Sequence, residues 1–320
     1  MPDTPSTHNL VQSSAHGSSR LRYSLIVFAG GACYGIIGSV VKLAYGDGFT
    51  FPQVTCTQTV FALATFLLLA LFDKLRGFRR VRLSWKERLQ LGAMGLVSAG
   101  TTTFYYLSLS MLPASVAIAL LFQFTWMGLV FEVACTRKRP HGASLVSVAV
   151  ILGGTVLASG LAEGTLEALN PLGILCGLAA AVCCASFMFL SGRVVTDAPV
   201  QQRGLWASVG YFAAGLAVCP DYFASGALTS GLWSYGLVLG PLSFVLPMML
   251  FGIGCARISP GLSTIMASSE LPISIACAVL VLHETVTPLQ LAGVAVILLG
   301  VVVAQLPSFR GMTVSKGGTS

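Results

Sequence analysis

Charged residues in this chain are sorted by segment, and the sorting restricts the possible folds more than any other feature. Long apolar stretches alternate with polar connections, and every Lys and Arg except Lys42 lies in alternate connections or in the two tails. The intervening connections carry only acidic residues, namely Asp47, Glu163, Glu167, Asp221 and Glu284. Short loops rich in Lys and Arg stay on the cytoplasmic side of a membrane. The pattern therefore predicts a polytopic membrane protein with a defined orientation.

The composition supports the membrane class. Only 9% of the 320 residues are charged and 55% are hydrophobic, whereas soluble domains are about 25% charged. The cytoplasmic loops account for the net charge of +7, so we expect no nucleic-acid partner. The HExxH, GxSxG, Walker A and GxGxxG motifs are absent, and the nine Cys form no CxxC or Cys/His cluster. We expect no enzyme, no cofactor and no metal site.

Apolar stretches long enough to cross a bilayer recur along the chain. A spanning helix needs about 20 apolar residues, and the stretches that qualify are 24–44, 53–72, 90–110, 114–135, 144–160, 171–190, 204–220, 233–254, 260–281 and 288–306. Residues 1–21 and 308–320 are polar and read as cytoplasmic tails, the first of them disordered. Ten spans place both termini in the cytoplasm, and the expected location is the cytoplasmic (inner) membrane.

An internal repeat divides the spans into two halves. Two segments align without gaps at an offset of 147, which pairs Pro113 with Pro260, Gln123 with Glu270, Thr125 with Pro272 and Gly153 with Gly300. The repeat unit is five spans, with halves at 22–160 and 171–307. Because five is odd, the second half enters the membrane from the opposite face. We therefore expect an all-α fold of ten transmembrane helices in two inverted five-helix repeats, a common transporter design with its site near the midplane.

Several short motifs resemble those of the EamA-type family of the drug/metabolite transporter superfamily. They are Ile258-Ser259-Pro260, Ser269-Glu270-Leu271-Pro272, His283-Glu284-Thr285, Gln290 to Gly293, Ile297 to Gly300, Tyr34-Gly35 with Lys42, and Tyr105 to Pro113. The resemblance covers about residues 22–307. It implies ten helices in two five-helix repeats and the export of amino acids, related metabolites or drug-like compounds.

The first half departs from this pattern at span four. Gln123 and Thr125 stand where the second half has Glu270 and Pro272. We expect the first half to have lost both the acid and the helix break, so that any ionisable function lies in the second half.

Glu270 is the leading candidate for a coupling or substrate-binding residue. It lies in the middle of span nine, where an ionised carboxylate is costly unless it is paired, hydrated or protonated. Pro272 removes the backbone donor for the carbonyl of Ser268 and should break the helix there. The alternative is a permanently protonated Glu270 that donates one interhelical hydrogen bond.

Three further polar residues leave alternatives open. Lys42 is near the external end of span one, where it either snorkels to the outer headgroups or points inward as a counter-charge. Glu132 is one turn from the basic residues that begin at Arg137, which favours a surface ion pair. His283 is expected in an exposed loop, although a titrating gate is conceivable at this place.

Aromatic and amide side chains mark the helices expected to form the pocket, which are spans one, three, four, six, eight and nine. Phenol and indole rings suit a flat or amphipathic organic solute better than a bare ion. Span eight has a second candidate helix break at Pro247. The remaining candidate lining residues are Tyr34, Tyr105, Gln123, Trp126, Phe187 and Phe244.

The preferred hypothesis is a secondary transporter that exports small organic solutes by alternating access, with proton exchange through Glu270. A passive facilitator needs no titrating group, and a membrane scaffold or sensor would bind a ligand without moving it. An intramembrane enzyme, the most distant reading, would alter its solute chemically. The sequence leaves the substrate, the coupling ion and the choice between monomer and homodimer open.

Overall fold

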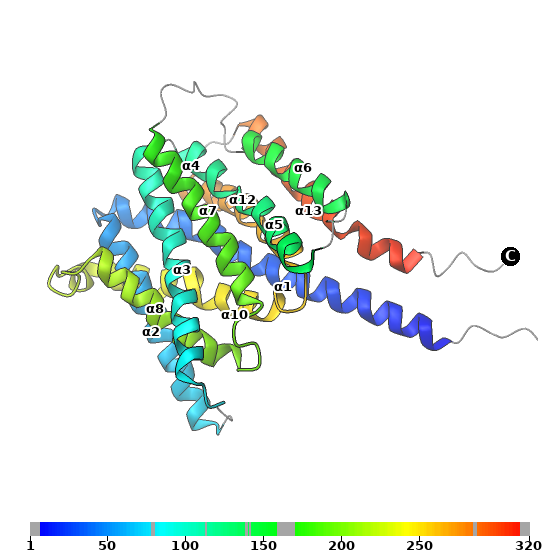
Figure 1. The fold of residues 1–320 in the computed structure, drawn as a ribbon. Coiled ribbons are helices and arrows are strands. Elements are labelled where there is room, and N and C mark those ends of the chain that lie inside the picture. The colour runs from blue at the N-terminus through cyan, green and yellow to red at the C-terminus, as the bar shows by residue number, and fades with distance from the viewer. Residues whose placement is uncertain are drawn as a thin grey trace, which may run out of the picture.

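The computed structural model describes residues 7–77, 81–112, 114–137, 140, 142–158, 170–283 and 287–313. Within these ranges the regular elements are all helices, and no strand occurs. The helices form one bundle, and the first and last described helices leave it on the same side (Figure 1). The predicted all-helical, polytopic membrane fold is confirmed.

Seven of the predicted spans are continuous helices in the described chain. These are α1 (Thr7–Gly46), α2 (Phe51–Leu75), α3 (Trp85–Met111), α6 (Gly142–Ala158), α7 (Pro171–Ser191), α8 (Val200–Val218) and α13 (Pro288–Thr313). The other three spans are interrupted. Span four comprises α4 (Ala114–Leu121) and α5 (Phe124–Thr136), span eight comprises η2 (Leu228–Leu232), α9 (Trp233–Gly240), η3 (Pro241–Val245) and α10 (Leu246–Gly254), and span nine comprises α11 (Pro260–Ala267) and α12 (Glu270–Leu282).

The lengths and hydropathies of these helices fit a bilayer. Within the described residues, six segments are long and apolar enough to cross a membrane: Arg20–Gly46, Phe51–Leu75, Ala117–Thr136, Pro171–Ser191, Leu228–Gly254 and Pro260–Val281. Gly142–Ala158 and Pro288–Val303 are shorter apolar helices. Helices α3 and α8 are outside this set, and α3 has the polar run Thr101 to Thr103 near its centre.

Both terminal helices extend beyond the predicted spans. Helix α1 begins at Thr7, within the segment expected to be a cytoplasmic tail. Helix α13 likewise continues to Thr313. Once a span has nucleated a helix, each further residue adds a backbone hydrogen bond without a new nucleation cost.

Span nine is interrupted at Ser268 and Ser269, one turn before Pro272. Proline has no backbone N–H, so the carbonyl of Ser268 loses its usual helical donor. The N–H groups of both serines bond to carbonyls three residues earlier, which tightens the chain into a turn. Both serines are buried, and α12 begins at Glu270.

Span four is interrupted at the equivalent place, between Leu121 and Phe124. The prediction that the first half lost its helix break is therefore wrong. In span four, side-chain hydrogen bonds stabilise the break, whereas in span nine Pro272 causes it. The Gln123 Nε2 donates to the carbonyl of Ala119 at 3.0 Å, and the Thr125 hydroxyl donates to the carbonyl of Phe122 at 2.9 Å. These bonds satisfy carbonyls within the membrane span, and such local bonds compete with regular helix.

Span eight contains a wider turn in place of a sharp break. Its π-helical segment η3 lies between α9 and α10, and the N–H of Leu246 bonds to the carbonyl of Pro241. Pro247 follows at once, where its missing N–H frees the carbonyl of Ser243. Such π-turns are frequent at functional sites.

Helix contacts occur in the pairs that two related halves would produce. Helix α1 packs against α10 and α12, and its counterpart α7 packs against α3 and α5. Helices α2 and α8, and α6 and α13, each pack against their own counterpart, and α5 of span four packs against α11 of span nine. Figure 1 shows α6 and α13 side by side at one edge of the bundle.

Glycines permit the closest of these approaches. A Cβ at Gly95 would lie 1.8 Å from the carbonyl oxygen of Ala207, and one at Gly210 would lie 1.9 Å from that of Gly92. Helices α3 and α8 therefore touch backbone to backbone, as small residues allow in membranes. In contrast, Gly153 of α6 has open space where a Cβ would be added.

A capping box starts α3 at its polar end. The Ser84 hydroxyl accepts from the Glu87 N–H at 3.3 Å, and the Glu87 carboxylate accepts from the Ser84 N–H at 2.6 Å. The backbone hydrogen bond from Ser84 holds the pKa of the Glu87 carboxyl below its usual range. Because the folded-state pKa is lowered, this contribution to stability is present at neutral pH and is lost as the pH falls through that pKa.

The glycine contact predicts a matched pair of substitutions. Gly210→Ala should lower the apparent melting temperature by roughly 5 °C because the new methyl group overlaps a backbone carbonyl that cannot move aside. Gly153→Ala should leave it unchanged. The measurement is loss of the monodisperse peak in detergent after heating, and equal melting of both variants would contradict the backbone contact.

Candidate functional site

A cavity of about 380 Å³ lies inside the bundle. Its lining comes from α1, α2, α3, α4, α7, η3 and α12, so both halves contribute. This volume is in the range of small-molecule sites. Of the residues predicted from sequence, the structure brings five to the cavity: Tyr34, Lys42, Tyr105, Phe187 and Glu270.

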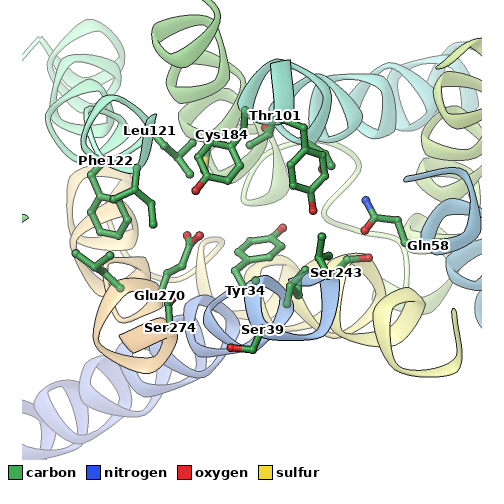
Figure 2. A pocket seen from close by; sticks show the side chains of 18 of the residues that line it. Tyr34, Ser39, Gln58, Thr101, Leu121, Phe122, Cys184, Ser243, Glu270 and Ser274 are labelled. Atoms are coloured by element: carbon green, nitrogen blue, oxygen red, sulfur yellow. The ribbon is translucent and has the colours of Figure 1, made fainter. Parts of the chain in front are cut away.

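Glu270 forms one polar end of the cavity. It is the first residue of α12, and Figure 2 shows its carboxylate directed into the pocket. The positive end of a helix macrodipole favours a carboxylate at this position. Among the described residues, no hydrogen bond or ion pair reaches the carboxylate. The structure therefore offers no interhelical partner for a permanently protonated Glu270, and the group faces the cavity.

Aromatic rings form the wall next to Glu270. Tyr34 of α1 lies between Glu270 and Gln58 in Figure 2. Its ring packs against Phe251, with the centroids 6.0 Å apart, and Phe187 packs against the same ring at 6.3 Å. Tyr105 of α3 completes the set. These rings present apolar faces and phenol hydroxyls to a solute.

The cavity extends to the C-terminal end of α1. Lys42 and Tyr45 both line it, and both are exposed. Lys42 thus lies at the mouth of the cavity, the place that the inward alternative requires. A cation at the mouth raises the local concentration of anionic groups.

The opposite end of the bundle is closed by packing. Phe187 contacts Phe244 and Phe251, and Arg203 lies beyond them, only 1% exposed. The charge pattern predicted Arg203 in a connection between spans, and that prediction is wrong, because Arg203 belongs to α8. Its guanidinium donates to the carbonyls of Ser191 and Gly252, near the ends of α7 and α10, where a cation complements the helix dipoles.

Gln123 and Trp126 do not reach the cavity. The Trp126 Nε1 donates to the Gln123 Oε1 at 3.0 Å, while the Gln123 amide holds the carbonyl of Ala119. Trp126 is 40% exposed, on the outside of the bundle. Both residues therefore support the interruption of span four and do not contact a solute in this conformation.

Phe244 is fully buried behind the cavity wall. Its ring stacks on Tyr211, with centroids 4.3 Å apart and planes inclined by 8°. It also packs against Phe66 and Phe187. Phe244 positions other side chains and is not a lining residue.

Polar residues that sequence reasoning missed line the far end of the cavity. They are Gln58 of α2, Ser98, Thr101 and Thr102 of α3, and Ser243 of η3. The signal was present for Gln58, because Thr55, Thr57, Gln58 and Thr59 form a polar cluster inside an apolar span. Span two was not among the helices predicted to form the pocket.

Two other polar candidates, Glu132 and His283, do not line the cavity. Glu132 accepts a hydrogen bond from the Gly261 N–H at 3.1 Å and so caps the N-terminus of α11. Lys138 and Arg139, two of the basic residues expected to pair with it, lie outside the described residues. His283 is exposed with a φ of 53°. Glu284 lies outside the described residues.

Chemistry at a metal or disulfide is not indicated in the described chain. No group of three or more His, Cys, Asp or Glu residues there is arranged to hold a metal ion. The nine cysteines are free thiols.

A polytopic helical bundle with a solute-sized cavity that is open at one end and packed at the other is the architecture of a small-solute transporter. The sequence comparisons agree. The profile of the EamA-like transporter family matches residues 21–160 and again residues 171–305. The chain belongs to this family.

The chain is also similar to individual transporters and to a solved structure. The chain is 28% identical over 254 residues to the threonine/homoserine exporter RhtA of Escherichia coli (strain K12), which covers 77% of this chain and 79% of the relative. It is 26% identical to the protein of the same name from Salmonella typhimurium (strain LT2), with the same coverage. One crystal structure superposes with a TM-score of 0.71 over 90% of this chain and 99% of the other, at 18% identity, which supports the fold.

The role of Gln123 generates a stability prediction. Gln123→Leu should destabilise the protein by about 1–2 kcal/mol because the Ala119 carbonyl loses its donor inside the membrane. Trp126→Phe removes only an exposed hydrogen bond and should melt like the parent. Thermal unfolding of both variants in detergent provides the measurement, and a Gln123→Leu protein as stable as Trp126→Phe would contradict this role.

Proposed function

We propose that the protein exports small polar organic solutes, amino acids among them, across the cytoplasmic membrane by alternating access in exchange for protons. One observation carries the proposal. The Glu270 carboxylate, which has no hydrogen-bond or ion-pair partner in the described part of the chain, faces a cavity of about 380 Å³ at the junction of the two halves. The family and the exporters named above support transport, and their names support amino acids as the solutes.

The sidedness follows from charge. The tails and the most basic connections belong in the cytoplasm by the positive-inside rule. The C-terminal end of α1, with Lys42 and Tyr45, then faces outward. The described conformation is outward-open, and the packing around Phe187 and Arg203 closes the cytoplasmic side.

Glu270 is the group proposed to couple transport to protons. In the outward-open state it takes a proton from outside, which removes the cost of a charge at mid-membrane. The neutral carboxyl group allows the cavity to close and reopen inward. There the proton leaves for the less acidic cytoplasm, and a solute enters the cavity for the return. Each cycle moves a proton inward and a solute outward.

Movement of the interrupted helices gives the cycle a physical basis. Half-helices joined by a turn can tilt separately, because the turn absorbs the change in φ and ψ. Spans four and nine cross next to the cavity, where the Thr264 hydroxyl donates to the carbonyl of Thr125 at 3.0 Å. A tilt of α12 would carry Glu270 between the two sides.

Glu270→Gln tests the coupling. The neutral amide mimics the protonated carboxyl, so a pH gradient should no longer drive uphill transport, while downhill exchange of threonine should persist. Proteoliposomes with an imposed pH gradient and labelled threonine measure both rates.

Glu132→Gln is the matched control, because this carboxylate lies outside the cavity, and it should keep uphill transport. Uphill transport by Glu270→Gln would contradict the coupling role. A wild type that moves threonine only downhill would indicate a passive facilitator, and a wild type that binds threonine without flux would indicate a sensor or scaffold.

Cysteine labelling tests the sidedness. In a protein freed of its native cysteines, Ser274→Cys in the cavity should react with a membrane-impermeant maleimide added to intact cells. Leu299→Cys, on the exposed face of α13, should not react, because a thiol facing lipid does not ionise. Labelling of Ser274→Cys only in inverted vesicles would reverse the proposed orientation.

A further inference from the structure

A buried acceptor without a hydrogen-bond partner faces the cavity at the end away from Glu270. Gln58 is 1% exposed and lines the cavity, and its Oε1 has no hydrogen-bond partner among the described residues. Figure 2 shows its amide directed into the pocket, with Tyr34 between it and Glu270. Buried side-chain acceptors are seldom left unbonded in folded proteins. This oxygen is therefore available for a donor on a solute.

The other side of the amide is fixed. The Gln58 Nε2 donates to the Tyr211 hydroxyl at 3.1 Å. Tyr211 is 1% exposed and held by its stack on Phe244. Thr102 of α3 and Ser243 of η3 line the same part of the cavity. The amide is thus oriented before any solute arrives.

Close packing of α2 on α8 holds the two residues together. A Cβ at Gly215 of α8 would lie 2.2 Å from the Thr59 hydroxyl oxygen, and one at Gly204 would lie 2.2 Å from the Phe66 ring. Gln58 and Tyr211 come from these two helices. Rigid elements of this kind make a selective site more precise than loops do.

We propose that Gln58, fixed by Tyr211, recognises a hydroxyl group of the transported amino acid and determines selectivity for hydroxylated over aliphatic side chains. The inference rests on the proposed function and names the substrate class of the same cavity. A hydroxyl group both donates and accepts, so it satisfies the carboxamide in either rotamer. A methyl group would leave Oε1 unbonded, and a carboxylate would place a second acceptor against it.

This assignment separates recognition from coupling. Gln58 carries no charge and does not titrate, whereas Glu270 lies at the other end of the cavity (Figure 2). Preference for a hydroxyl over a methyl group should therefore be the same at every pH at which the protein binds solute. A preference generated by Glu270 would change with pH.

Two isosteric pairs of amino acids test the proposal. Threonine and valine differ by a hydroxyl in place of a methyl group, and so do homoserine and norvaline. Binding to the purified protein is measured by calorimetry, and transport is measured by counterflow in proteoliposomes. The wild type should prefer the hydroxylated member of each pair at least about tenfold, since a site built to bond a hydroxyl rejects the analogue that lacks it.

Gln58→Met keeps the length of the side chain and removes the amide. In this variant the affinity for the hydroxylated member of each pair should exceed the affinity for the aliphatic member by less than about threefold. The change should come mainly from weaker binding of the hydroxylated member. Tyr211→Phe removes the hydrogen bond that orients the amide and should lower the ratio in part. Thr57→Val is the matched control, because its hydroxyl faces Tyr222 at 2.7 Å and does not line the cavity, so the ratio should stay at the wild-type value.

Each outcome decides one of the two proposals. Equal binding of threonine and valine by the wild type, binding of neither, or an unchanged ratio in Gln58→Met overturns the role of Gln58. If Gln58→Met does not fold, the wild-type ratio and Tyr211→Phe still decide. Selective binding without counterflow would refute transport and would still support recognition by Gln58. Counterflow without selectivity would support transport and refute recognition by Gln58.

Discussion

Backbone groups inside a membrane have no water to bond, and this constraint determines where the molecule can place a polar site. A helix can be interrupted in hydrocarbon only where other protein groups satisfy the freed carbonyls. Spans four and nine meet this requirement differently. In span nine the N–H groups of the buried Ser268 and Ser269 bond to the carbonyls of Ile265 and Met266. In span four the side chains of Gln123 and Thr125 supply the donors. The cavity lies next to these two interruptions, and its carboxylate is the first residue after one of them.

Much of the fold could be predicted from the sequence because membrane spans depend on strong, local signals. Apolar length located the spans, the distribution of Lys and Arg ordered the connections, and the offset of 147 related the halves. The break in span four could not be predicted in this way. A proline signals a break in the sequence, whereas Gln123 and Thr125 stabilise this one through side-chain hydrogen bonds that depend on exact geometry.

The candidate site was predicted in part, for a related physical reason. Glu270 was identifiable since a carboxylate at mid-membrane is exceptional. Whether Phe187, Phe244 or Trp126 lines a cavity depends on which way each side chain points, and the apolar composition of a span does not carry that information. Gln58 was missed because an uncharged amide costs less free energy inside a membrane than a charged group does, so an amide in a span is a weaker signal of a functional site. Its position became informative only when Tyr211, 153 positions away, was placed against it.

The contact between Gly92 and Gly210 also limits how such a protein can move. Helices α3 and α8 come from different halves and touch there through backbone atoms. A seam without intervening side chains cannot slide by a fraction of a turn, because any shift would force Cα atoms into a facing carbonyl. The two halves are therefore joined along the contact between α3 and α8, and their relative motion is a rotation about this contact. Residues near the pivot, Gln58 and Tyr211 among them, would keep their mutual geometry throughout the cycle, while those farthest from it travel most.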